Sequence, residues 1–561
     1  MRPLIRRSVA ESTALTDFHP VLARVYSARG VHGPAELDYR LSRLLPIGSL
    51  DGLDQAVDLL LSHRERRLTV IGDFDADGAT STALVLRCLR RFGFAEVDYL
   101  VPNRFDFGYG LSPEIVAVAA KRSPGLIITV DNGISSVAGV EAARSQGIDV
   151  LVTDHHLPPR DLPAASAIVN PNLNGSGFGS GNLAGVGVAF YLMASLGRRL
   201  ENGGQDRASQ LPAEYLDLVA LGTVADVVRL DHNNRILVRQ GLERIRAGRS
   251  VPGIRALLRV AGRSPDNLVS TDLGFAVGPR LNAAGRLNDM SVGIECLLTD
   301  DESTAAKLAG ALDDINHERR DIEARMREQA FSAVDSIPLD DLPDCVALYD
   351  ERWHAGIVGL VAARVKERCH RPVIAFAKVS ADELKGSGRS VAGVHMRDLL
   401  EAVSSRAPGL IRKFGGHAMA AGLSIAPSDY PDFCTELARQ MTTIYGDADF
   451  SGAILTDGTL PADALNIGFA RQLREAGPWG AGFPEPVFQG DFRVAEQRVV
   501  GERHLKLKVF ADGADRPLDA IAFNQEHPGL RGDVRLAYRL DVNEFRGIES
   551  AQLVVEQITV L

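Results

Sequence analysis

Three short runs of acidic residues and histidines have the residue types for metal chemistry. They are DFDADG at 73–78, DNG at 131–133 and DHH at 154–156. Each run directly follows an apolar segment that is predicted to be a strand. Because ligands of open α/β sheets bind at the carboxyl ends of the strands, we expect the three runs to converge on one crevice.

Their composition indicates a divalent metal site. Carboxylates crowded in a protein interior repel one another unless a cation compensates their charge. Carboxylates suit hard cations and imidazole adds affinity for first-row metals, so the mixed set indicates Mn²⁺ or Mg²⁺. One bridging carboxylate can hold two such ions roughly 3.5–4 Å apart, and the pair activates water for phosphoryl transfer. The sequence therefore predicts metal-assisted hydrolysis of a phosphate ester.

Other interpretations of the same residues are weaker. An EF-hand calcium loop needs a glutamate at its twelfth position, where DFDADG places Leu84. A cluster that only caps the following helix would explain the first run, but not three runs at successive strand ends. Asp226, in GTVADVV, is equally well explained as an acid on a helix surface.

The elements that must position these residues alternate between strand and helix. We expect strands at 68–72, 97–101, 126–130, 150–153 and 167–169, and helices at 79–91, 112–121 and 136–146. Such alternation predicts an α/β fold with a parallel sheet and helices on its faces. The Gly/Ser-rich run at 174–182 lacks the Lys-Ser/Thr of a phosphate-binding loop and is predicted to be a solvated loop.

Periodicity further along the chain predicts three more parts. Apolar residues recur on one face of 302–334, which predicts a long amphipathic helix that joins two domains. The strand–helix pattern then restarts in a smaller α/β domain, and from about residue 450 alternating segments such as 505–509 predict a small β-barrel or sandwich. The expected boundaries are an N-terminal segment 1–50, a catalytic domain 51–300, the connecting helix 301–335, the second domain 336–449 and the β domain 450–561.

Composition excludes several classes of protein. The 561 residues include 62 Lys or Arg and 72 Asp or Glu, a net charge of −10, which argues against a protein held to nucleic acid by bulk positive charge. The five cysteines include no CxxC pair, so neither a disulfide framework nor a zinc ribbon is expected. The apolar segments are too short to span a bilayer, and the N-terminus lacks the apolar core of a signal peptide. We expect a cytoplasmic protein without a membrane partner.

The motifs resemble those of a known enzyme family. VIGDFDADGATSTA, VPNRFDFGYGLS, TVDNGISS, TDHHLP and GTVADVV are similar to successive motifs of the DHH phosphoesterase superfamily. GPRLNAAGRL, WHAGIVG, SGRS, FGGHAMAAG and PWGAGFPEPVF resemble its RecJ family of single-strand-specific DNA exonucleases. The resemblance runs from about residue 45 to the end. It implies a parallel-sheet DHH domain, the long helix, a smaller α/β DHHA1 domain and a C-terminal β-barrel of the OB-fold type.

The resemblance also implies the catalytic residues. The expected metal ligands are Asp75, Asp77, Asp131, His155 and Asp226. Asp131 would bridge two Mn²⁺ or Mg²⁺ ions. Ile71 stands where many superfamily members have a histidine, and Asp73 is expected to replace it at the first ion. Asp154 would orient a histidine, and His156 would complete the catalytic set by facing the scissile phosphate.

Substrate contacts are expected in the remaining motifs. The candidates are Asn103, Arg104, Arg280, Asn282, Arg286, Ser387, Arg389 and His417. A guanidinium fork matches a phosphate bidentately, whereas a lone arginine elsewhere is more often a solvated surface residue. Glycines beside Ser387, Arg389 and His417 let backbone approach a ligand, and the resemblance implies that this second domain binds the DNA end and its terminal phosphate.

The C-terminal domain has weaker signals for a DNA path. It holds 12 basic and 16 acidic residues in 451–561, so any path must be a local basic stripe, for example Arg503, Lys506 and Lys508. An exposed strand face explains that run equally well. Trp479 and Phe483 are as well explained by packing at the domain junction as by stacking on bases.

The resemblance implies a 5′ to 3′ exonuclease specific for single-stranded DNA. It would use two Mn²⁺ or Mg²⁺ ions, release 5′-mononucleotides in DNA recombination and repair, act as a monomer, and work with a single-strand-binding protein and a helicase. One alternative is a DHH phosphoesterase for oligoribonucleotides or other small phosphoesters, although the C-terminal β domain favours a polymer. A non-catalytic DHH scaffold is the other, but it predicts lost acids, and none is missing.

Overall fold

The structure is a computed structural model that describes residues 2–9, 13–102, 110–337, 342–446, 450–501, 504–525 and 529–561. It divides into two compact units. The larger unit comprises Leu4–Asp313 and Leu455–Leu561, and the smaller unit comprises Met1–Pro3 and Asp314–Ile454. No helix among the described residues is long and apolar enough to cross a membrane.

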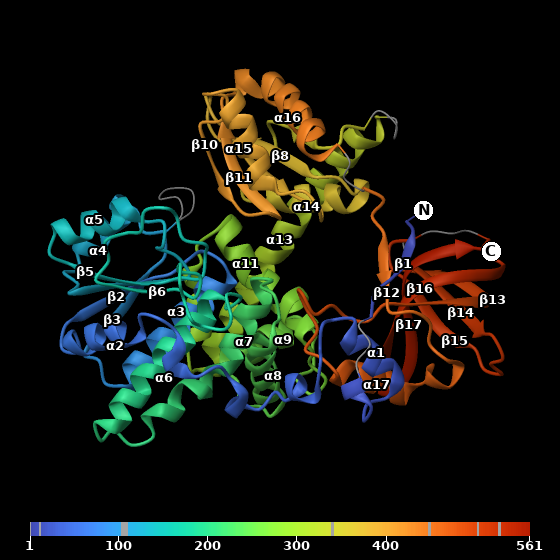
Figure 1. The fold of residues 1–561 in the computed structure, drawn as a ribbon, viewed down its shortest axis with the longest axis horizontal. Helices are drawn as coiled ribbons and strands as arrows, with labels where there is room; N and C mark the ends of the chain where they lie inside the picture. The colour runs from blue at the N-terminus through green and yellow to red at the C-terminus, as the bar shows by residue number, and fades with distance from the viewer. Residues whose placement is uncertain are drawn as a thin grey trace. The chain divides into compact units, whose positions relative to one another are not determined.

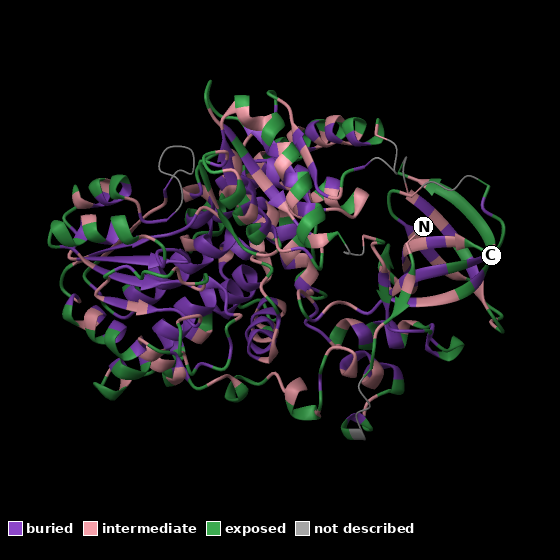
Figure 2. Cartoon of the chain, turned by 45° about the horizontal axis from the view of Figure 1, so that its top comes forward, coloured by how far each residue is buried: buried purple, intermediate pink, exposed green. Residues whose placement is uncertain are grey.

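A five-stranded parallel sheet is the centre of the first part of the larger unit (Figure 1). Its order is β3-β2-β4-β5-β6, with β2 (Arg67–Ile71), β3 (Glu96–Leu100), β4 (Leu126–Val130), β5 (Asp149–Thr153) and β6 (Ala167–Val169). Every residue of β4 is buried, as parallel strands covered by helices on both faces require. Figure 2 shows this burial across the sheet. The predicted parallel α/β domain is confirmed.

Helices surround this sheet and continue beyond it. They are α1 (Pro20–Ser27), α2 (Leu53–Ser62), α3 (Ala76–Arg91), α4 (Pro113–Ala120), α5 (Val137–Ser145), α6 (Gly185–Asn202), α7 (Leu216–Ala225), α8 (His232–Arg246), α9 (Pro252–Val260), α10 (Ser270–Asp272), α11 (Gly278–Leu287), α12 (Ser291–Leu298) and α17 (Ile467–Glu475). Short 3-10 helices are η1 (Thr13–Leu15), η2 (Pro34–Leu37), η3 (Leu41–Arg43), η4 (Ile47–Ser49), η5 (Ala208–Tyr215) and η9 (Ala462–Ala464). The π-helical turn η6 (Leu273–Val277) joins α10 to α11, so 270–287 is one helical run.

The long helix is α13 (Glu302–Asp335), close to its predicted range. The smaller unit has a five-stranded sheet in the order β10-β11-β9-β8-β7, parallel only between β7 and β8. Its strands are β7 (Val346–Tyr349), β8 (Val373–Lys378), β9 (Leu384–Arg389), β10 (Lys413–Gly416) and β11 (Ala420–Ile425). Its helices are α14 (Val358–Cys369), α15 (Met396–Arg406) and α16 (Tyr430–Tyr445), with η8 (Pro427–Asp429). The predicted second α/β domain is confirmed.

The C-terminal strands form a closed five-stranded barrel, as predicted. Its order is β13-β14-β15-β17-β16, with β13 (Phe488–Val500), β14 (His504–Ala511), β15 (Leu518–Ala522), β16 (Gly532–Phe545) and β17 (Ile548–Val560). Outside it, β1 (Leu4–Arg6) pairs with β12 (Ile454–Thr456). One apolar cluster includes both Leu84 of α3 and Phe488 of the barrel, so both belong to one core.

The structure adds detail to two sequence interpretations. Phe178 and Ser180 of the predicted solvated loop are buried, and the Ser180 hydroxyl donates to Asp231 at 2.5 Å. Lys506 and Lys508 of the predicted basic stripe lie 3.5 and 3.2 Å from carboxylates of neighbouring strands, while Arg503 lies outside the described residues. Residues 174–182 contain neither helix nor strand and most of them are exposed, so the segment is a loop as predicted, with Phe178 and Ser180 as its buried members.

Candidate two-metal centre

Five side chains from four segments of the larger unit meet at one point. Asp75 caps the N-terminus of α3 and Asp77 lies in its first turn, Asp131 follows β4, His155 follows β5, and Asp226 is the C-cap of α7. The His155 Nε2 atom lies 3.1 Å from a carboxylate oxygen of Asp131, 3.5 Å from Asp226 and 4.0 Å from Asp77. The strand-end runs therefore converge, as the parallel sheet requires.

Three groups of ligand atoms lie close enough together to hold metal ions. Within each group the atoms are at most 4.8 Å apart, and the groups are Asp77/His155/Asp226, Asp73/Asp75/Asp131 and Asp131/His155/His156. Asp131 and His155 each belong to two of the groups, and the role of Asp131 as a bridging ligand stays a prediction. Oxygen donors with one or two imidazoles fit Mn²⁺ or Mg²⁺. Asp73 lies with Asp75 and Asp131, consistent with the role predicted for it.

Asp77 is held by the start of α6. Its two carboxylate oxygens accept hydrogen bonds from the N–H groups of Gly185 at 2.6 Å and Val186 at 2.9 Å. Burial, and then the charge of Asp75, raises the pKa of Asp77 to about 7, although the two N–H donors oppose that shift. The sequence did not predict these two donors, because every residue except proline has a backbone N–H and residue type does not show where it points.

Asp131 has a strained backbone. Its φ is 62°, in the left-handed region that a non-glycine residue seldom occupies. The side chain is buried, and a Cβ atom on Gly185 would stand 2.6 Å from the Asp131 Cβ, so only glycine fits beside it. Burial, and then the charge of Asp77, raises the pKa of Asp131 well above its usual value. Backbone strain and charge crowding thus coincide at this residue.

The acids as a group fit divalent cations. Burial, followed by the charge of Asp77, also raises the pKa of Asp226 well above its ordinary value. Several buried carboxylates at one place are therefore unfavourable when all are ionised. A bound divalent ion is the largest local charge in such a site and reverses this preference. The carboxylates and imidazoles of the site are therefore suitable ligands for two hard divalent cations.

The pKa values of the two histidines are shifted in opposite directions. Burial, and then the charge of His156, lowers the pKa of His155 to about 4, so its imidazole is neutral at pH 7 and offers a lone pair. Burial alone would lower the pKa of His156, but the hydrogen bond and charge of Asp154 raise it. Asp154 lies 2.8 Å from His156 Nδ1 and also accepts from the N–H of Ile134 at 2.9 Å. His156 is the half-exposed member of the pair.

The α11 motif lies directly beside the first acidic run. Asn282 Oδ1 accepts the hydrogen bond of the Ala76 N–H at 2.8 Å. Arg280 is buried, donates to the Ala276 carbonyl at 2.5 Å and pairs with Asp313 at 2.8 Å. Arg286 lies in the last turn of α11. Their roles as substrate contacts stay predictions, and the predicted contacts Asn103 and Arg104 lie outside the described residues.

The smaller unit brings Ser387 and Arg389 together on β9. Arg389 donates to the Ser387 hydroxyl at 2.9 Å, and burial lowers its pKa. No described carboxylate lies within the 4.0 Å of an ion pair with this guanidinium. A Cβ atom on Gly359, in the first turn of α14, would stand 2.7 Å from the Arg389 guanidinium. His417 lies on the exposed turn between β10 and β11, and its N–H donates to the carbonyl of Ala420, the residue that pairs with Arg389 across the two strands.

Three family models match the chain in order. The DHH family, N-terminal domain, matches residues 67–223, the DHHA1 domain matches 343–443 and the RecJ OB domain matches 456–557. These matches cover the parallel sheet, the smaller unit and the barrel. The metal-site residues Asp75, Asp77, Asp131 and His155 fall inside the first match, and Asp226 lies just beyond it.

Named relatives are similar over nearly the whole chain. The single-stranded-DNA-specific exonuclease RecJ of Dickeya dadantii is 53% identical over 568 residues, which cover 99% of this chain and 98% of that protein. The Escherichia coli protein of the same name is 52% identical over 569 residues, with coverage of 99% and 98%. The crystal structure of RecJ from Thermus thermophilus in complex with Mn²⁺ has a TM-score of 0.84 at 30% identity and covers 100% of this chain and 80% of that one. A structure in complex with Mg²⁺ from the same organism has a TM-score of 0.77 at 28% identity, with coverage of 100% and 79%.

Proposed function

This chain belongs to the RecJ family, and on that premise we propose that it is a single-stranded-DNA-specific exonuclease. It would hydrolyse phosphodiester bonds from the 5′ end and release 5′-mononucleotides. The observation that carries the proposal is the position of His155 Nε2, which has carboxylate oxygens of Asp131, Asp226 and Asp77 within 4.0 Å. A donor set of this kind suits phosphoryl transfer.

In this proposal the residues of the chain hold the metal ions and contact the scissile phosphate. The proposed ligands are Asp73, Asp75, Asp77, Asp131, His155 and Asp226. Two Mn²⁺ or Mg²⁺ ions bound there would supply an activated water and positive charge at the scissile phosphate. His156 would donate a hydrogen bond to a phosphate oxygen, because Asp154 raises the pKa of its imidazole and so favours the protonated form.

The end of the strand is proposed to bind in the smaller unit. A partly buried guanidinium without a carboxylate partner favours an anion, and a guanidinium matches phosphate oxygens in pairs. Arg389 and Ser387 would therefore hold the terminal 5′-phosphate, with the first turn of α14 alongside. Holding one kind of end at one place makes cleavage depend on that end. His417, on its exposed turn, is proposed to contact the nucleotide.

The cellular setting follows from the same family membership. We place the activity in DNA recombination and repair in the cytoplasm, with the protein acting as a monomer beside a single-strand-binding protein and a helicase. The predicted domain boundaries are retained as part of this proposal. A scaffold without catalysis is disfavoured because all the expected acids are present and close together. A small-substrate phosphoesterase is disfavoured by the barrel.

Labelled substrates test the activity. The purified protein with Mn²⁺ is incubated with 5′- or 3′-labelled single strands, duplexes and dinucleotides, beside Asp131→Ala. We expect immediate release of labelled mononucleotide from the 5′-labelled strand, progressive shortening of the 3′-labelled strand, and an inactive variant. Cleavage confined to dinucleotides, or duplex cleavage at an equal rate, would sink the proposal.

A second comparison tests the end pocket. Arg389→Gln should remove the preference for a 5′-phosphate over a 5′-hydroxyl, with a KM that rises about tenfold for the phosphorylated strand because a charge-assisted contact is lost. Lys385→Gln is the matched control, since Lys385 is an exposed cation on the same strand. Equal preference in wild type and Arg389→Gln would refute the assignment of the pocket.

A further inference from the structure

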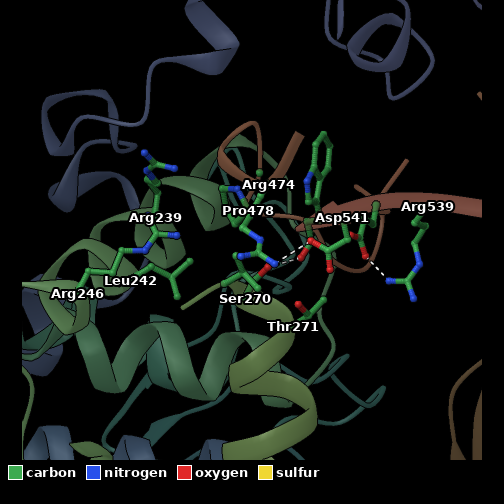
Figure 3. A pocket seen from close by; sticks show the side chains of 13 residues that line it. Arg239, Leu242, Arg246, Ser270, Thr271, Arg474, Pro478, Arg539 and Asp541 are labelled. Carbon is green, nitrogen blue, oxygen red and sulfur yellow. Dashed lines mark hydrogen bonds and ion pairs between the residues drawn. The ribbon is translucent and has the colours of Figure 1, made fainter. Parts of the chain in front are cut away.

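An arginine-rich cavity lies elsewhere in the larger unit, where α8, α17 and the barrel meet (Figure 3). Its volume is about 80 Å³. Arg239 and Arg246 come from α8, Arg474 comes from α17 and Arg539 comes from β16, and Figure 3 shows Arg474 between the first two and the last. We call these four residues and the space between them the arginine pocket. None of the sequence motifs predicted it.

The arginine pocket has more cations than partners. Its lining contains four guanidinium groups but only two carboxylates, Glu485 and Asp541. Arg539 pairs with Glu485 at 2.5 Å, and Arg474 pairs with Asp541 at 2.8 Å. Glu243, outside the lining, pairs with Arg239 at 2.8 Å, so one guanidinium, that of Arg246, remains without a carboxylate partner among the described residues. This excess is local, because the barrel segment 451–561 has more acids than bases.

Arg246 is the least compensated of the four. Its Nε and one terminal nitrogen both donate to the Leu268 carbonyl, at 2.9 and 2.6 Å, and a guanidinium has five N–H donors. No described carboxylate lies within 4.0 Å of it. Burial, and then the charge of Arg239, lowers its pKa. Arg239 pairs with Glu243 of its own helix at 2.8 Å and donates to the Glu475 carbonyl at 3.1 Å.

The remaining lining indicates which ligand fits. Thr271 contributes a hydroxyl group, whereas the Ser270 hydroxyl already donates to the Trp479 carbonyl at 2.6 Å. Guanidinium forks together with a hydroxyl match the oxygens of a phosphate. Trp479 also lines the cavity, but its ring is buried, stacks on Phe483 at 5.1 Å and donates to the Leu473 carbonyl at 2.9 Å. The buried ring cannot stack on a base. A ligand would therefore be bound through its phosphate and without regard to base identity.

We propose that the arginine pocket binds one phosphate group, either a backbone phosphate of the single strand or a free phosphate. This inference rests on the proposed function. Ser270 begins the helical run that carries Asn282 beside the metal-binding loop, and twelve residues of helix span roughly 18 Å. A strand phosphate in the pocket thus lies several nucleotides from the cleaved bond. A dinucleotide at the metal centre cannot reach it.

Salt dependence of binding tests the proposal. The affinity for a 5′-phosphorylated 20-nucleotide strand is measured without divalent ions at several KCl concentrations, for the wild type and for Arg239→Gln/Arg246→Gln. The slope of log K against log [salt] should fall by about 0.7 for the lost phosphate contact, and Kd should rise about tenfold. Arg199→Gln is the matched control, because Arg199 is a half-exposed arginine of α6 that pairs with Asp58. An unchanged slope in the double variant would refute the binding of a strand phosphate in the arginine pocket.

A second variant keeps the test decisive if Arg239→Gln/Arg246→Gln does not fold. Thr271→Glu places a carboxylate in the cavity, which should raise the melting temperature and still reduce the slope. Free phosphate is tested by melting the wild type and Thr271→Glu in inorganic phosphate and in chloride at equal ionic strength. Protection of the wild type alone assigns the pocket to free phosphate. Unchanged slopes together with no phosphate protection overturn the proposal entirely.

Nuclease assays separate the two proposals. If the wild type degrades single strands but all variants keep the wild-type salt slope, only the proposal that the arginine pocket binds a phosphate is refuted. Wild type that does not degrade single strands refutes the proposed function. If both hold, the double variant should lose efficiency on the 20-nucleotide strand and keep wild-type kcat/KM on a dinucleotide.

Discussion

Asp131 combines two unfavourable features, a left-handed backbone and a buried carboxylate among other acids. Proteins retain such features where they serve function at a cost in stability. Asparagine has nearly the same shape, tolerates positive φ and has no charge. The residue therefore allows a direct comparison of function with stability.

We predict that Asp131→Asn is more stable than the wild type without metal and much less active. Removing one of several crowded charges should raise the melting temperature in EDTA by a few degrees. Activity with Mn²⁺ should fall by at least about a hundredfold. Calorimetry in EDTA and in Mn²⁺ checks both parts, because Mn²⁺ at 100 times its Kd stabilises the wild type by about 2.7 kcal/mol. A variant that melts lower in EDTA would contradict this account of charge crowding.

Asn282 is a positioning residue for the metal-binding loop by its observed contact. Its Oδ1 accepts the Ala76 N–H, one residue from Asp75. Asn282→Ala leaves that N–H without its partner, which costs about 1–3 kcal/mol, and should weaken Mn²⁺ binding about 10- to 100-fold. Asn282→Asp keeps the acceptor and should recover most of the affinity. Titration calorimetry of Mn²⁺ binding distinguishes the roles, since a pure substrate contact would alter KM and leave metal affinity unchanged.

At the scale of elements, α11 packs closely against the acidic run at 73–78. A Cβ atom on Gly285 would stand 1.7 Å from the Phe74 carbonyl oxygen. The helix therefore approaches the loop through a glycine and bonds it through Asn282. The helix and the loop should respond together to mutation.

Gly285→Ala should destabilise the larger unit by more than about 2 kcal/mol, because the helix or the loop must move. Gly310→Ala is the matched control within α13, where nothing lies within 4 Å of the added Cβ. That change should stabilise by about 0.5–1 kcal/mol, since alanine is the better helix former. Urea unfolding measures the free energy of unfolding of both variants. A Gly285→Ala variant that is as stable as the wild type or more stable would refute the argument from the close contact with Phe74.

At the scale of the whole molecule, the N-terminal segment, the parallel-sheet part and the barrel belong to one unit. Arg29 and Asp457 form a buried pair at 2.7 Å with side chains 1% and 0% exposed. Arg29 also donates to the Pro484 carbonyl at 2.7 Å. Residues more than 400 positions apart therefore depend on one another for their charge balance.

Arg29→Met should destabilise the larger unit by about 3–5 kcal/mol, because it leaves the Asp457 carboxylate buried without its cation. Adding Asp457→Asn should recover more than half of that loss, since the amide keeps an acceptor for the Val487 N–H. Arg535→Ala, which breaks the exposed pair with Asp491, should cost about 0–1 kcal/mol. Equal losses in the buried and exposed pairs, measured by urea unfolding, would show that burial does not set the energy.

Much of the fold could be predicted because its signals are local. The range predicted for β4 matches the observed one, since a run of five apolar residues ended by a polar turn specifies a buried strand. Strand β13 was missed because a bulge between Val494 and Glu496 interrupts its alternation. The alternation of 505–509 did identify β14, whose Leu505, Leu507 and Val509 are buried.

The sequence by itself determined the chemistry available to this protein, because acids and histidines placed directly after apolar strands must meet at one edge of a parallel sheet. Only the tertiary structure decided how those groups are held. The N–H donors of α6 on Asp77, the pairing of Arg280 with Asp313 and the arginine pocket all join distant segments. Packing chooses such partners by shape and burial, and neither quantity is carried by a local pattern of residue types.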